Sequence, residues 1–73
     1  MALNITFYFA EIEPDTNMCI SVESTSNSAQ GTMPNWVSIP VYDEEYIFKY
    51  YNWDNGKFYY DEEYTEEYIS PLL

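Results

Sequence analysis

The sequence predicts a mainly β fold: a small antiparallel domain of two hairpins and a middle strand, with one or two short helical turns near the C-terminus. Apolar and polar residues alternate over residues 3–9, 18–23 and 36–41, which is typical of strands with one buried face. An Asn-Gly pair at residues 55–56 stands between aromatic residues, which is a strong hairpin signal. The 73 residues suit one domain, residues 1–73, that buries about 60% of its unfolded surface.

The first hairpin is expected to join two amino-terminal strands through the turn sequence PDTN at residues 14–17. In the first strand the apolar residues at alternate positions, expected to be buried, are Leu3, Ile5, Phe7 and Phe9. In the returning strand they are Met18, Ile20 and Val22. Cys19 lies within that strand and is the only cysteine, so we expect a buried, inert thiol and no disulfide.

The middle of the chain predicts a loop followed by a short strand. Residues 24–35 are rich in serine and threonine and contain Gly31 and Pro34, so we expect a long exposed loop. Residues 36–41 alternate as a strand does. Pro40 has no N–H to donate, so this strand must lie at an edge or stop there.

The aromatic segment 50–60 predicts the second hairpin. With Asn55 and Gly56 as the two residues of a type I′ turn, Asp54 faces Lys57 as an opposite-charge pair, and Trp53 faces Phe58. One face of the ribbon is then wholly aromatic. Its members are Tyr51, Trp53, Phe58 and Tyr60.

A five-residue phrase, YDEEY, occurs at residues 42–46 and again at 60–64. In each copy the aspartate is a good helix N-cap, and the acids after it suit the positive end of a helix, so each predicts a short helical turn. Tyr64 and Tyr68 are four residues apart and would share one face of a short helix that Pro71 ends. Leu72 and Leu73 follow as an apolar tail.

The composition argues against several classes of function. Thirteen carboxylates against two lysines give a formal net charge of −11, which would repel nucleic acid and anionic membranes, so we expect neither as a direct partner. The chain has no histidine and only two glycines, so we expect no enzyme, no metal site and no cofactor. Its amino-terminal apolar stretch lacks a basic region, so we expect a soluble protein made in the cytoplasm.

Four segments resemble a short module found in phages and prophages of Gram-positive bacteria. They are FAEI at residues 9–12, NMCISV at 17–22, IPVYD at 39–43, and Tyr51 with NGKF at 55–58. The likeness spans roughly residues 8–60. The resemblance implies a small structural protein that is associated with the phage tail, and so with the virion, and that carries no catalytic residue.

The first functional hypothesis is therefore protein contact, either as a homo-oligomer or with another phage structural protein. Aromatic residues anchor such interfaces. The expected contact residues are Tyr51, Trp53, Phe58, Tyr60, Tyr64, Tyr68, Leu72 and Leu73. Three alternatives stay open: the same rings form the core of the monomer, the aromatic hairpin binds cell-wall carbohydrate, or the acidic surface mimics nucleic acid and inhibits a basic protein.

Overall fold

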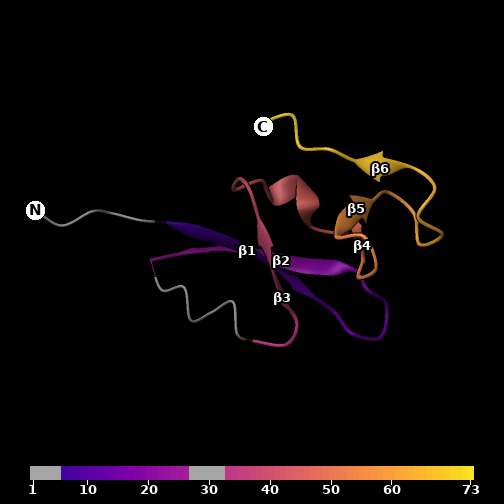
Figure 1. Cartoon of the computed structure of the whole chain (residues 1–73), viewed down its shortest axis with the longest axis horizontal. Coiled ribbons are helices and arrows are strands. Elements are labelled where there is room, and N and C mark those ends of the chain that lie inside the picture. The colour runs from indigo at the N-terminus through magenta and orange to yellow at the C-terminus, as the bar shows by residue number, and fades with distance from the viewer. Residues whose placement is uncertain (1–5, 27–32) are drawn as a thin grey trace, which may run out of the picture.

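Two antiparallel three-stranded sheets make up the domain in a computed structural model that describes residues 6–26 and 33–73 (Figure 1). This confirms the predicted mainly β class. The strand orders are β2-β1-β3 and β4-β5-β6. The elements are β1 (Phe7–Ile12), β2 (Cys19–Thr25), β3 (Trp36–Ile39), the 3-10 turn η2 (Glu44–Tyr46), β4 (Tyr50–Asn52), β5 (Lys57–Tyr59) and β6 (Glu67–Tyr68).

The core lies on the face of β1 opposite to the predicted one. Ala10 and Ile12 are fully buried in the main hydrophobic cluster, and Tyr8 packs against it. Phe9 is also buried, but it lies on the other face, where its ring centroid is 6.0 Å from that of Trp36. The alternation of apolar residues predicted the strand correctly but not which of its faces is buried. The second sheet and η2 cover the face that carries Ala10 and Ile12. Leu3 and Ile5 lie outside the described residues.

A β-bulge changes the pattern of β2. Glu11 pairs with Ser21, but Ile12 pairs with Cys19, so Ile20 is the extra residue. The bulge brings both Cys19 and Val22 into the core and leaves Ile20 exposed. The expectation that Ile20 shares a buried face with Val22 was therefore wrong.

The turn and the edge strand of the first sheet are largely as predicted from the sequence. The predicted turn at residues 14–17 is present: Asn17 has a φ of 63°, and the Glu13 N–H donates to the Met18 carbonyl at 2.8 Å. β3 is an edge strand that ends immediately before Pro40, as expected. The predicted loop 24–35 begins too early, since β2 continues to Thr25, and residues 27–32 of that loop lie outside the described part.

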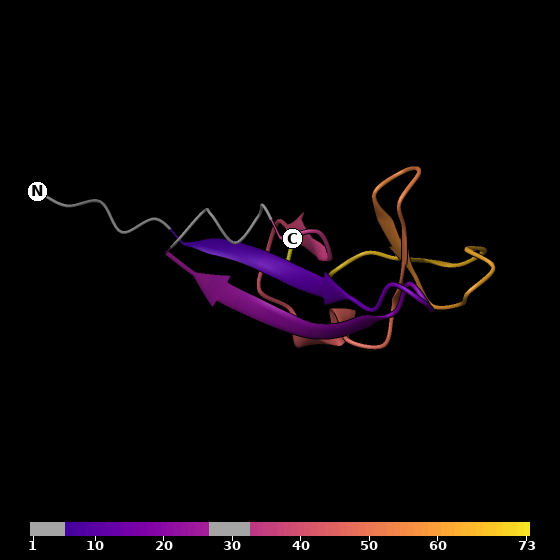
Figure 2. The ribbon, with the colours of Figure 1, turned by 90° about the horizontal axis from the view of Figure 1, so that it is seen from below.

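The two sheets are joined where β2 begins. Met18 forms an isolated bridge with Tyr50, and the Cys19 N–H donates to the Lys49 carbonyl at 2.8 Å. The Phe48 N–H donates in turn to the Cys19 carbonyl at 2.8 Å. In Figure 2 the β4–β5 ribbon runs across the direction of β1 and β2, at the end where those strands meet their turn.

The second hairpin forms, but its register is shifted by two residues. Tyr51 pairs with Phe58, where Trp53 was expected, and residues 53–56 make a four-residue connection. The Gly56 N–H donates to the Asn52 carbonyl at 2.8 Å, and Gly56 has the positive φ, 74°, that the sequence led us to expect there. Because the shift is even, Tyr51 and Phe58 still share a face. Lys57 pairs with Glu67 at 3.9 Å instead of with Asp54.

The two YDEEY copies fold differently. The first forms η2, with the Asp43 carboxylate accepting from the Glu45 N–H at 2.9 Å, as the N-cap prediction requires. In the second, Asp61 accepts from the Thr65 N–H at 3.1 Å and its hydroxyl at 2.6 Å, closing a turn without a helix. The helix predicted over Tyr64 and Tyr68 is wrong, because Tyr68 pairs in β6.

Candidate functional site

A buried carboxylate, that of Asp43, ties η2 to the C-terminal segment. Asp43 is 5% exposed and accepts hydrogen bonds from the side chains of Tyr68 and Ser70 as well as from the Glu45 N–H. Burial acts to raise the pKa of Asp43, but these donors outweigh it and hold the pKa below its usual value. Burial, and then the bond to Asp43, raise the pKa of Tyr68. This cluster is closed to solvent and serves the fold.

Both lysines are engaged within the chain. The Lys49 ammonium lies 4.8 Å from the ring centroid of Tyr68 and 5.0 Å from that of Tyr60, and it donates to the Glu45 carbonyl at 2.8 Å. Lys57 pairs with Glu67. Neither lysine is left to neutralise the other carboxylates, so the surface of residues 6–26 and 33–73 is strongly acidic.

No catalytic or metal-binding group stands out among residues 6–26 and 33–73. No three of their acidic, cysteine or histidine side chains are placed to hold a metal ion. The Cys19 thiol is fully buried, as expected, and donates to the Ser21 carbonyl at 3.4 Å. Burial raises the pKa of Cys19 to about 11, so it remains protonated and is a poor nucleophile.

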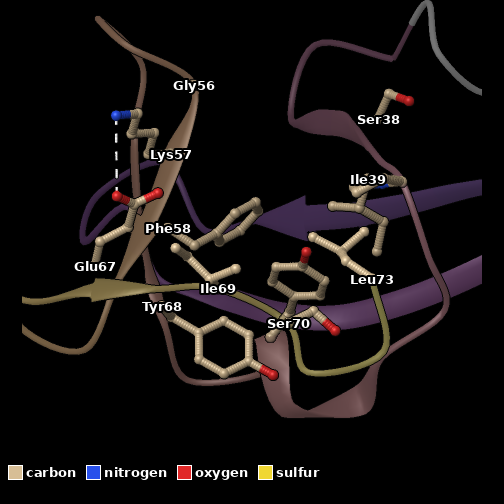
Figure 3. A pocket seen from close by; sticks show the side chains of 12 residues that line it. Ser38, Ile39, Gly56, Lys57, Phe58, Glu67, Tyr68, Ile69, Ser70 and Leu73 are labelled. Atoms are coloured by element: carbon tan, nitrogen blue, oxygen red, sulfur yellow. Dashed lines mark ion pairs between the residues drawn. The ribbon is translucent and has the colours of Figure 1, made fainter.

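A small apolar groove lies between the end of β3 and the β5–β6 side of the second sheet. Its volume is about 180 Å³. Figure 3 shows Phe58 and Ile69 on one side and Ile39 and Leu73 on the other. Lys57 and Glu67 are its only charged side chains, and they neutralise each other. Ligand pockets usually hold about 300 Å³ or more, so this groove suits a protruding side chain better than a small molecule.

Part of the predicted contact set belongs to the core. Phe58 and Tyr68 are buried and pack around Tyr46, with ring centroids 4.6 and 5.3 Å from it. Tyr51 is partly buried, 4.9 Å from Phe58. Tyr64 is partly buried too, and its hydroxyl donates to the Tyr51 carbonyl at 3.4 Å. For Phe58 and Tyr68 the alternative of a monomer core is therefore correct.

The other predicted contact residues remain on the surface. Trp53 is 48% exposed, with its ring edge-on to Tyr51 and its Nε1–H donating to the Asn17 side-chain oxygen at 3.0 Å. Tyr60, Leu72 and Leu73 are also exposed. Trp53 does not line the groove, whereas Leu73 does. The expected contact residues therefore divide between at least two surfaces.

Sequence reasoning missed the most unusual surface residue, Phe48. Its side chain is 71% exposed, and its φ of 74° lies in the left-handed region, which a bulky residue rarely adopts. No sequence signal marks this position, because glycine or asparagine is the usual sign of a left-handed residue. Ile69, 66% exposed at the rim of the groove, was missed as well.

Comparisons with known proteins add no family. No protein-family model, curated protein or solved structure matches the chain. Within the part of the chain that the structure describes, no helix has the length and apolar character needed to cross a membrane.

Proposed function

We propose that this chain is a small structural protein of the phage or prophage kind that it resembles, and that it works by contact between identical copies. Support comes from one observation above all. On a chain of net charge −11, the groove beside β6 has a neutral lining and is rimmed by the exposed side chains of Ile69 and Leu73. Apolar surface of this kind marks interaction sites.

Charge explains why copies would meet at this face. Two chains of like charge repel each other wherever their carboxylates come together, and this repulsion is weak at the groove because its lining side chains carry no net charge. An isologous contact places the same patch on both subunits, so the rim residues of one copy can fill the groove of the other. Burying Ile69 and Leu73 would then supply the apolar core that a stable interface needs.

The test is the solution mass over a dilution series, measured by light scattering. We expect the wild type to exceed its monomer mass of 8.7 kDa as concentration rises. Ile69→Ser should keep the fold, because this side chain is largely exposed, and should remain a monomer. Trp53→Ser removes an exposed side chain of the hairpin loop, away from the groove lining, and should still associate.

Either of two results would overturn self-association at the groove. One is a wild type that stays monomeric at every concentration. The other is dissociation of Trp53→Ser together with retained association of Ile69→Ser, which would move the interface to the aromatic hairpin. The virion assignment has its own test, peptide mass spectrometry of purified particles, and particles that lack the chain would contradict it.

A second candidate function, binding of cell-wall carbohydrate, is favoured by the way Trp53 is held. Its indole is exposed yet fixed in orientation by Asn17 and by the edge contact with Tyr51, as a ring that stacks on a sugar would be. Titration of the Trp36→Phe variant with cell-wall fragments isolates the fluorescence of Trp53. A saturable change would support this function, and an unchanged spectrum would remove it.

A further inference from the structure

A second surface, distinct from the groove, surrounds Phe48. The backbones of Phe48 and Ile20 are neighbours, because the Phe48 N–H donates to the carbonyl that precedes Ile20. Phe48 is 71% exposed and Ile20 44%, the latter because the β-bulge turns it out of the core. Two exposed apolar residues thus stand at neighbouring backbone positions, one at a left-handed residue before β4 and the other at the bulge of β2.

The conformation of Phe48 makes this exposure informative. A phenylalanine at a φ of 74° is strained, and its exposed ring adds little to the core, so the side chain serves the fold poorly on both counts. Strain of this kind persists where the surrounding structure fixes it, and here the hydrogen bonds of Phe48 and Cys19 do so. Glycine or asparagine would suit this backbone better. The fold therefore does not account for a phenylalanine at this position, and a contact with another molecule would.

Three exposed carboxylates lie on η2 and β2, the two elements next to this apolar pair in the chain. η2 packs against β2 and carries the exposed side chains of Glu44 and Glu45. The Tyr42 hydroxyl donates to the Glu44 carboxylate at 3.4 Å, and Glu23 of β2 is close enough to act on the same tyrosine. Among residues 6–26 and 33–73, ion pairing is confined to Lys57 and Glu67, so none of these three carboxylates is neutralised by a lysine.

We propose that Phe48 and Ile20, bordered by Glu23, Glu44 and Glu45, bind a basic segment of another protein that carries apolar side chains among its lysines or arginines. The apolar pair would form the desolvated centre of the contact and the carboxylates its charged rim. A second copy of this chain would bring like charges together, and nucleic acid or an anionic membrane would be repelled. This surface is separate from the groove, so a chain that self-associates keeps it available.

The probe is a labelled peptide of alternating lysine and leucine, with a lysine-only peptide of equal charge as its comparison, both followed by fluorescence anisotropy. We expect the wild type to bind the mixed peptide more tightly than the lysine-only one. Phe48→Asn should weaken binding of the mixed peptide by about tenfold or more, the loss typical of a central anchor. The double variant Glu44→Gln, Glu45→Gln should bind both peptides more weakly, and its affinity should depend less on the salt concentration.

Three controls make the result decisive. Trp53→Asn removes another exposed aromatic ring and should leave peptide affinity unchanged, as should Ile69→Ser, which separates this surface from self-association. Ile20→Ser alters the same patch without changing Phe48, and it should also weaken binding of the mixed peptide. The proposal is overturned if Phe48→Asn and Ile20→Ser, both folded by circular dichroism, bind the mixed peptide like the wild type, or if Trp53→Asn weakens it equally.

Discussion

The hydroxyl of Tyr68 donates its hydrogen bond to the buried carboxylate of Asp43, and this contact joins β6 to the turn η2 across 25 residues of sequence. Removing the donor leaves a buried charge with one partner fewer, which costs about 1–3 kcal/mol. We expect Tyr68→Phe to lower the free energy of unfolding by this amount in urea denaturation. Tyr60→Phe, at an exposed tyrosine, is the matched control, and equal losses in the two variants would contradict this role.

The same carboxylate predicts an acid-sensitive stability. Because the pKa of Asp43 is lowered in the folded state, its contribution is complete above the pKa of the unfolded chain, about 3.9, and is lost as the pH falls through the folded value. The urea midpoint of the wild type should therefore fall steeply below about pH 4. Asp43→Asn should be less stable at neutral pH, and its urea midpoint should fall less as the pH is lowered below about 4. An identical fall in both proteins would exclude Asp43 as the cause.

Replacing Phe48 by asparagine should stabilise the domain. Asparagine adopts the left-handed conformation more readily, and a non-glycine residue held there costs about 1–2 kcal/mol. Little packing is lost, because the ring is largely exposed. We expect Phe48→Asn to raise the melting temperature while it loses peptide binding. A lower melting temperature would show that Phe48 contributes to the fold.

The Cys19 thiol should react only when the chain opens. It is fully buried, and burial raises its pKa to about 11, so little thiolate forms at neutral pH. We expect a thiol reagent to label the native protein slowly and the urea-unfolded protein at once. Ile20→Cys in a Cys19→Ala background places a thiol one residue away at the exposed bulge and should label rapidly. Rapid labelling of native Cys19 would contradict its burial.

The sequence could predict the class of fold and most of the strands, but not which way the strands face. Alternation identified β1, yet whether Phe9 or Ala10 faces the core depends on where the second sheet packs, and that contact is distant in sequence. The bulge at Ile20 leaves no local signal either. It lies where β2 is still paired with β1 on one edge and is bonded on its other edge to residues 48–50.

The Asn-Gly pair predicted a hairpin and a left-handed glycine, and both are present. The register failed because neighbouring side chains compete with the two-residue turn. Asn52 accepts from the Asp54 N–H at 2.8 Å and Asn55 from the Lys57 N–H at 2.9 Å, which stabilises a longer connection. Of the expected contact residues, the sequence could not separate the core rings from the exposed ones, since their chemistry is the same.

The junction of the two sheets at Asn17, Met18 and Cys19 has a consequence for the order in which the protein becomes stable. One edge of this short stretch bonds to Ile12 and Glu13, while the other bonds to Lys49, Tyr50 and Tyr51. An isolated two-stranded hairpin is only marginally stable in water. The amino-terminal hairpin and the last third of the protein should therefore gain their stability together, in one cooperative step.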